Sequence, residues 1–140
     1  MPALSSPALH LQVAGAILVG VGIAHIALPR ALGWQVEMTR LSMLNRQISY
    51  VHAFFIGMAC VQFGLLALVA HADLLRGGHL ARAVLVGAVA FWGVRLLVQL
   101  FVFDPSLWRG RLLTVVGHLA FVGLWTYETA AFAWPLVHRG

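Results

Sequence analysis

Four long apolar stretches, separated by short polar ones, occupy nearly all of this 140-residue chain. Only 9% of the residues are charged and 61% are hydrophobic, whereas a soluble domain carries about 25% charged residues. Because about 20 apolar residues suffice to cross a bilayer, each stretch is long enough to form a transmembrane helix. The sequence therefore predicts an all-α integral membrane protein, an antiparallel four-helix bundle in which residues 1–140 form a single transmembrane domain with spans at about 9–28, 48–70, 80–103 and 112–137.

The connections between the predicted spans differ in length. Proline removes a backbone donor and clashes with the preceding turn, so Pro29 is expected to end the first span. The segment that follows places Trp34, Met38 and Leu41 at helical spacing among polar residues, which predicts an amphipathic helix lying in the membrane interface between spans 1 and 2. An ordinary loop is the alternative. The glycine pair Gly77-Gly78 predicts a tight turn between spans 2 and 3.

Small residues mark where the first helix contacts a neighbour. Gly15 and Gly22 are seven residues apart and so lie on one helical face, and small residues let helices approach closely in lipid. His25 follows one turn later beside that seam, so it is expected to face protein. The lone cysteine, Cys60, forms neither a disulfide framework nor a CxxC motif.

Polar residues of all four spans fall at similar depth from one membrane side, here called side B. At a rise of about 1.5 Å per residue, His25 and His52 lie about 5 Å inside side B, and Gln99 lies about 6 Å inside. His118 and Arg95 lie deeper, at about 9 Å and 12 Å. Buried polar groups in a bilayer are costly and usually face the bundle interior, where they serve a function. This layer is the candidate site.

Helical facing supports the same interpretation. Trp92, Arg95 and Gln99 form one stripe on the third span, while Asn45 and His52 share a face as i and i+7. Glu128 is a candidate counter-charge for Arg95. The predicted ligand-binding residues are Arg95, Gln99, Trp92, Tyr50, Asn45 and Arg46, and the predicted metal ligands are His25, His52 and His118. The four remaining histidines, expected to be plain interfacial residues, are His10, His71, His79 and His138.

Several chemistries fit such a layer, and the sequence leaves them open. Imidazole is a common ligand of haem iron and of transition metals, and arginines could meet haem propionates. A quinone, an isoprenoid or another lipid could instead place its polar head there. No HxxxH, HExxH or CxxCH motif is present to choose between them, and no catalytic residue can be named. The function predicted is a small integral membrane protein that binds a ligand or a redox or metal cofactor through His25, His52, His118 and Arg95. The alternatives are a non-catalytic accessory subunit of a membrane complex and a membrane enzyme using the histidines as acid/base groups on a lipid-like substrate.

Charge predicts location and partners. The nine basic residues are all arginines, and most of them flank the apolar stretches instead of forming the clustered face that nucleic acid requires. The expected partners are the lipid bilayer, a lipophilic small molecule, and a second copy of the chain or a larger membrane complex.

An even number of spans puts both termini on one side of a membrane, taken as a prokaryotic inner membrane, and the positive-inside rule places side B in the cytoplasm and the termini outside it. The arginines compared are Arg30, Arg40, Arg46, Arg109 and Arg111 at side B and Arg76, Arg82 and Arg139 at the other side.

Overall fold

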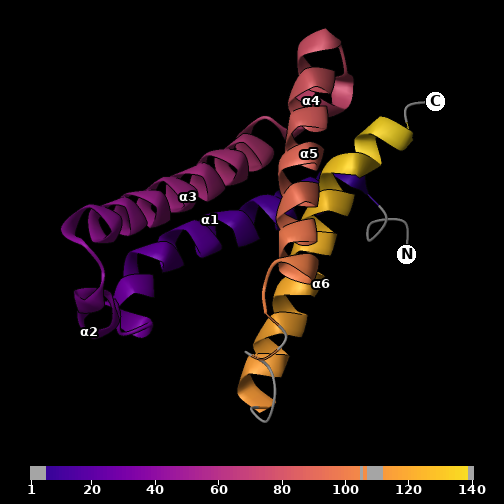
Figure 1. The fold of residues 1–140 in the computed structure, drawn as a ribbon. Helices are drawn as coiled ribbons and strands as arrows, with labels where there is room; N and C mark the ends of the chain where they lie inside the picture. Colours follow the sequence, from indigo (N-terminus) through magenta and orange to yellow (C-terminus); the bar gives the residue numbers. More distant parts are fainter. Residues whose placement is uncertain (1–5, 105, 107–111, 139–140) are drawn as a thin grey trace. The chain divides into compact units, whose positions relative to one another are not determined.

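The computed structural model describes residues 6–104, 106 and 112–138, and no strand occurs among them (Figure 1). The all-α prediction is therefore confirmed for this part of the chain. Four long helices carry the apolar stretches, joined by shorter helical pieces. In chain order the elements are α1 (Pro7–Ala31), α2 (Trp34–Glu37), the 3-10 turn η2 (Met38–Arg40), α3 (Met43–Val69), α4 (His71–Arg76), α5 (His79–Phe101) and α6 (Leu112–Val137).

Three of these helices are long and apolar enough to cross a membrane: α1, α3 and α5. The fourth, α6, has 26 residues but is not among the candidates found in the described residues. Polar residues such as His118, Tyr127 and Glu128 interrupt its apolar sequence and lower its mean hydropathy. A membrane location is thus supported by three helices, and the crossing by α6 belongs to the proposal below.

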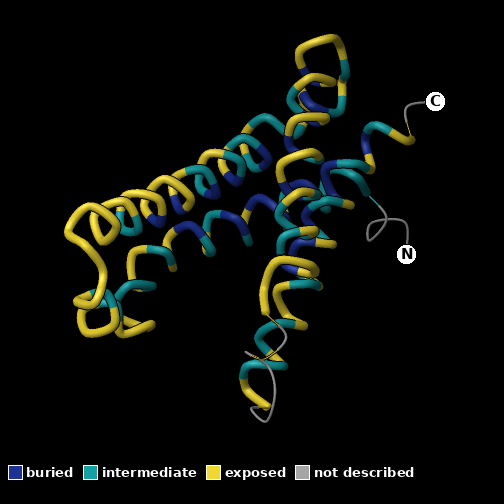
Figure 2. Tube along the Cα trace, in the orientation of Figure 1, coloured by how far each residue is buried: buried dark blue, intermediate teal, exposed yellow. Residues whose placement is uncertain are grey.

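Two units make up the structure, one of residues 12–70 and one of residues 1–11 together with 71–140. In the first unit α1 and α3 run side by side (Figure 1). The buried residues of α3 recur every three or four positions along one face, as the dark bands of Figure 2 show. That spacing is the helical repeat of a single contact face. The residues are Ala53, Gly57, Cys60, Gly64 and Ala67.

The helix α3 begins earlier than the predicted span, at Met43 instead of about residue 48. Ser42 caps it, because the Ser42 hydroxyl oxygen accepts a hydrogen bond from the Asn45 amide at 3.3 Å. A serine at this position satisfies one of the free amides of the first turn. Asn45 and Arg46 consequently lie in the first turns of a long helix. The hydropathy of the sequence does not reveal this earlier start.

The connection between α1 and α3 is not the continuous amphipathic helix that the spacing predicts. It consists of the four-residue helix α2 followed by the three-residue turn η2. Leu41 is extended, with φ −87° and ψ 152°, which separates these pieces from α3. Short isolated helices are marginal, because nucleating a helical turn costs more than the few hydrogen bonds return.

Pro29 does not end α1, which continues to Ala31. The proline removes one donor, yet Leu32 still donates from its amide to the Leu28 carbonyl oxygen at 2.9 Å. Gly33, two residues beyond the last residue of the helix, has a left-handed φ of 64°. A left-handed glycine is a common helix terminator because it has no Cβ to clash, so the stop signal lies four residues after the one that the sequence suggested.

The second unit contains α4, α5 and α6, and α5 and α6 pack along much of their length (Figure 1). Gly77 and Gly78 separate α4 from α5 with φ of 91° and 105°, which confirms the predicted glycine turn. The α5 face with Trp92 and Gln99 is buried, as is the α6 face with Trp125. Arg109, Arg111 and Arg139, three of the arginines compared for the orientation, lie outside the described residues.

Candidate functional site

Glycines bring the backbones of α1 and α3 into direct contact. A Cβ placed on Gly22 would lie 2.6 Å from the carbonyl oxygen of Gly57, and a Cβ on Gly64 would lie 2.7 Å from that of Gly15. Real Cβ atoms do not approach so closely, so no larger residue fits without a shift. The predicted seam of Gly15 and Gly22 is confirmed, and its partners on α3 have the same seven-residue spacing.

His25 lies in this contact, as expected. A Cβ on Gly57 would approach the His25 Cβ to 2.8 Å, so the histidine packs against α3. Its ring Nδ1 lies 2.8 Å from the carbonyl oxygen of Val21. A carbonyl only accepts, so Nδ1 carries the proton and donates, and the lone pair of the neutral ring is on Nε2. The fold thus fixes which nitrogen of His25 is available to a ligand.

A pocket opens beside this seam, within the unit of residues 12–70. Its volume is ≈ 580 Å³, within the range of about 300–1,000 Å³ found for small-molecule sites. The polar side chains on its wall are those of His25 and Tyr50, both of which the sequence selected. All the other lining residues are glycines or apolar: Gly22, Ile23, Ile26, Pro29, Ala53, Phe54, Gly57, Met58 and Val61.

Tyr50 is held by the connection that precedes α3. The Trp34 ring of α2 meets the Tyr50 ring edge-on, with centroids 5.5 Å apart and an interplanar angle of 74°. Edge-to-face packing is a favoured arrangement of aromatic rings. The short helix α2 therefore positions one polar residue of the pocket, although the sequence indicated for Trp34 only a place in an interfacial helix.

The other residues selected near the start of α3 are exposed and are not part of the pocket wall. Asn45 and Arg46 lie in the first turns of the helix and are exposed. His52 is exposed too, and its Nδ1 lies 2.8 Å from the Ile48 carbonyl oxygen. Like His25, it donates from Nδ1 and presents Nε2.

On the α5 and α6 pair, two tryptophans form the centre of the contact. The rings of Trp92 and Trp125 are 5.3 Å apart and nearly parallel, at 3°, and only 1% and 4% of these residues is exposed. The Arg95 guanidinium lies over the Trp125 ring, 4.9 Å from its centroid, and 5.8 Å from that of Phe103. A cation over an aromatic face is stabilised by the ring quadrupole. The structure thus brings together Trp92 and Arg95, and adds Trp125. The signal available in the sequence was that Trp125 follows His118 by seven residues and so shares its helical face.

One turn further along α5, Gln99 joins the two helices through His118. The Gln99 Nε2 donates to His118 Nδ1 at 2.9 Å, and only 3% of Gln99 is exposed. Since Nδ1 accepts, the neutral ring carries its proton on Nε2. Trp92 and Gln99 are buried within this pair, and a side-chain hydrogen bond links Gln99 to His118.

Glu128 is not the counter-charge of Arg95. It is completely buried, and neither of its carboxyl oxygens has a hydrogen-bond partner among the described residues. Its position on α6, three residues after Trp125, places it one turn beyond the ring on which Arg95 stacks. The arginine interacts with aromatic faces instead of this carboxylate.

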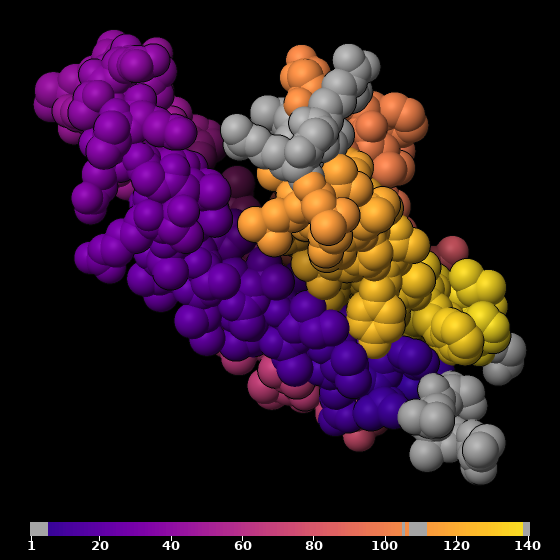
Figure 3. Space-filling view, turned by 90° about the horizontal axis from the view of Figure 1, so that it is seen from below, coloured from indigo at the N-terminus to yellow at the C-terminus, as the bar shows by residue number. Residues whose placement is uncertain are grey.

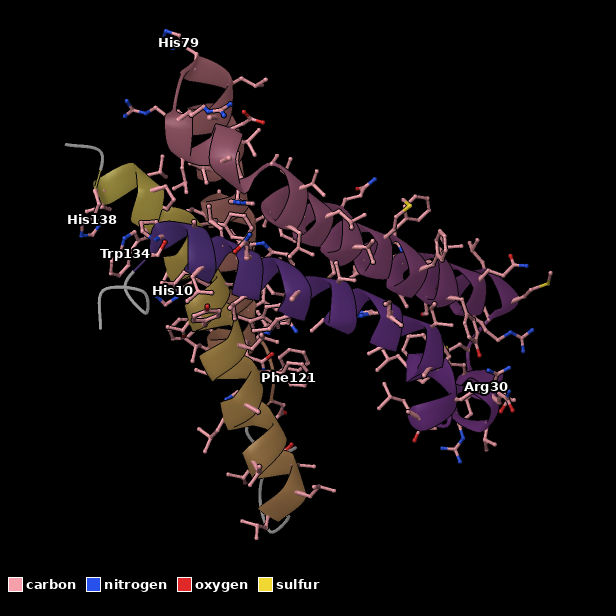
Figure 4. All side chains as sticks on the ribbon, turned by 180° about the vertical axis from the view of Figure 1, so that it is seen from behind. His10, Arg30, His79, Phe121, Trp134 and His138 are labelled. Carbon is pink, nitrogen blue, oxygen red and sulfur yellow. The ribbon has the colours of Figure 1, made fainter. Side chains whose placement is uncertain are left out.

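Four residues at the start of α1 and the end of α6 form a cluster, among them two histidines expected to be plain interfacial residues. His10 Nδ1 is 3.3 Å from the Tyr127 hydroxyl, and the His10 and Trp134 rings stack at 5.8 Å. His138 stacks on Trp134 at 4.6 Å, so the tryptophan lies between two imidazoles (Figure 4). Figure 3 shows the indigo start of α1 against the yellow end of α6. The spacing of Tyr127, Trp134 and His138 along one helical face could have indicated this cluster.

No group of three or more histidine, cysteine or acidic side chains in the described part of the chain is arranged to hold a metal ion. His25 and His52 belong to one unit and His118 to the other. Their grouping into a single site stays a prediction from the sequence. Comparison with known proteins yields no matching family model, no matching curated protein and no matching solved structure.

Proposed function

We propose that this protein is a four-span integral membrane protein that binds a lipophilic small molecule in the pocket between α1 and α3. Three helices already meet the requirements of a span. The fourth, α6, is 26 residues long and contains a single charged residue, Glu128, so its length exceeds the roughly 20 residues that a crossing needs. With four spans, both termini lie on one side of the membrane, and side B lies in the cytoplasm.

The observation that carries the proposal is the composition of the pocket wall. Ligand sites are concave and mostly apolar, with a few polar groups that orient the ligand. Here His25 and Tyr50 are the polar groups in an otherwise apolar wall of ≈ 580 Å³. A tail enters the apolar part, while the Nε2 lone pair of His25 accepts from, and the Tyr50 hydroxyl donates to, a polar head.

Photolabelling with a lipid probe tests this proposal. The probe is a phosphatidylcholine with a diazirine in one acyl chain, presented to the full-length protein in neutral nanodiscs. We expect labelled peptides to concentrate in residues 22–29 and 50–61. Uniform labelling of every exposed helical face would show ordinary lipid contact and overturn the proposal.

A matched pair of variants separates a pocket-bound molecule from general lipid contact. Ala53→Phe places a ring in the pocket wall and should abolish the concentrated labelling. Ala59→Phe adds the same ring to α3 at a position that does not line the pocket, and should leave the labelling unchanged. Equal labelling of both variants would contradict a pocket-bound molecule.

A redox cofactor is the second candidate, favoured by the hydrogen bonds of two histidines. His25 and His52 each donate from Nδ1 to a backbone carbonyl at 2.8 Å. Metal-ligating histidines commonly make this contact, because it orients the ring and raises the basicity of the other nitrogen. A Soret band in the absorption spectrum of the purified protein, lost in His25→Ala or His52→Ala and kept in His71→Ala, would support haem. The absence of any such band together with a metal content at background would remove this candidate.

A further inference from the structure

We infer that the molecule bound between α1 and α3 is an anionic lipid whose phosphate is held by Arg30 and Arg46. This inference rests on the proposed function, since it names the chemical class of the ligand for the same pocket. The charges that support it lie beside the pocket wall and are not part of it.

Arginines gather at one end of the α1 and α3 pair. Arg30 directly follows the pocket residue Pro29 at the end of α1, where Figure 4 labels it. Arg46 lies one helical turn before the pocket residue Tyr50, on the same face of α3. Because α1 ends and α3 begins at this end, the short connection from Gly33 to Ser42 keeps the two arginines at the same depth.

The charges at this end are not balanced within the unit. Arg40 of η2 adds a third cation, and Glu37 is the only acidic residue in the range 12–70. Among the described residues, none of the three arginines has a carboxylate within 4.0 Å, the ion pair found being Arg76 with Asp73. All three arginines are exposed. Glu37 shares a helical turn with Arg40, so the cations left for a ligand are chiefly Arg30 and Arg46.

A phosphate head group with a net negative charge fits this arrangement better than a zwitterionic or uncharged one. Guanidinium groups bind phosphate oxygens through paired N–H donors, and basic residues beside a transmembrane helix attract anionic lipids. An apolar pocket whose lining residues Pro29 and Tyr50 lie within one helical turn of Arg30 and Arg46 offers a place for the tail and a place for the head. Since the arginines lie at the end of the helix pair and the pocket wall is apolar, we expect the occupant to need both an anionic head and an apolar tail.

The test compares two lipids that differ only in the head group. Diazirine-tagged phosphatidylglycerol and phosphatidylcholine with identical chains are mixed in equal amounts with the full-length protein. We expect the anionic lipid to label residues 22–29 and 50–61 preferentially, and each of Arg30→Gln and Arg46→Gln to reduce that preference about fivefold. Arg82→Gln is the matched control, because Arg82 is an exposed arginine of α5, and it should leave the preference unchanged.

The outcomes separate this inference from the proposed function. Equal pocket labelling by both lipids would overturn the anionic head group and leave the proposed function standing. No pocket labelling by either lipid would overturn both. Inorganic phosphate is added at millimolar concentration in a further arm. Complete loss of phosphatidylglycerol labelling there would identify a site for free phosphate and overturn the lipid assignment, while retained labelling supports it. An unchanged preference in Arg30→Gln and Arg46→Gln would equally overturn it.

Discussion

The two helix pairs of this chain solve the same packing problem in opposite ways. In α1 and α3, glycines remove the side chains from the contact, so backbone meets backbone at Gly15, Gly22, Gly57 and Gly64. In α5 and α6, the contact is filled by the stacked rings of Trp92 and Trp125 and closed by polar interactions. Between membrane helices the hydrophobic effect gives no preference, so van der Waals packing and hydrogen bonds decide.

This difference has a functional consequence. A glycine seam holds two helices close at a few points. The pocket lies beside these points, and its wall includes large residues such as Phe54 and Met58. An aromatic seam fills its own contact. The pocket therefore adjoins the glycine pair, while the buried polar bond between Gln99 and His118 lies in the aromatic pair.

The largest expected effect comes from filling the glycine seam. Gly22→Leu forces a side chain against the Gly57 carbonyl and Val61, and should lower the free energy of unfolding by about 3 kcal/mol. Thermal unfolding in detergent, followed by circular dichroism, measures the change. Gly20→Leu is the control, because nothing lies within 4 Å of a Cβ at Gly20. If both variants lose the same stability, the backbone contact is not what holds α1 to α3.

Next in size is the polar bond of the aromatic pair. Gln99→Leu leaves the His118 imidazole without its partner and should cost about 1–2 kcal/mol of stability. The double variant Gln99→Leu with His118→Leu should recover part of that loss, since replacing both partners by apolar groups leaves no unsatisfied polar group. The same unfolding experiment provides the measurement. If the double variant lost as much unfolding free energy as the two single variants together, or more, the result would contradict a pairwise bond.

The aromatic pair also provides a test of Arg95. Arg95→Leu and Trp125→Leu, alone and together, form a double-mutant cycle that isolates their coupling. We expect a favourable coupling of about 1 kcal/mol, the size of a partly desolvated cation–π contact. Arg95→Lys should retain part of it because lysine keeps the charge and loses the planar stacking. A raised unfolding midpoint in Arg95→Leu would show that the cation is only tolerated.

How far the sequence predicts this structure depends on the kind of signal. Hydropathy locates four long helices, and small-residue spacing locates Gly15 and Gly22 with His25 beside them. Both signals are local, since they need only the helical repeat. The predicted stripe of Trp92, Arg95 and Gln99 also holds within its own helix pair, for the same reason.

The features that the sequence does not predict depend on contacts or on caps. Ser42 sets the start of α3, and Gly33 sets the end of α1. Both residues lie in a segment whose apolar spacing predicts a single continuous helix, so the spacing does not reveal either boundary. The Arg95 guanidinium lies over the Trp125 ring and not beside Glu128, because the stacking of Trp125 on Trp92 places the Trp125 ring under the guanidinium. His10 meets Trp134 across more than a hundred residues, and periodicity along one helix carries no information about such a pair.

The smallest expected effect concerns the connections, where the two pairs differ again. The connection after α1 contains the aromatic contact of Trp34 with Tyr50, whereas the one after α5 contains a carboxylate turn at Asp104. The Ser106 amide donates to Asp104 Oδ1 at 2.7 Å, and this backbone hydrogen bond, with one from the Ser106 side chain, lowers the pKa of Asp104 below its ordinary value of 3.8.

Because the folded pKa of Asp104 is depressed, the ionised turn stabilises the folded state above pH 3.8, and this contribution is lost as the pH falls through the lower folded pKa. Asp104 is fully exposed, so the change is small. Asp104→Asn should flatten the dependence of the unfolding midpoint on pH below about 4, between the unperturbed pKa of the carboxyl and the lower pKa of the folded state. Asp73→Asn is the control, since Asp73 is an exposed carboxylate of the same unit. A pH dependence that persists in Asp104→Asn and disappears in Asp73→Asn would transfer the effect to the ion pair of α4.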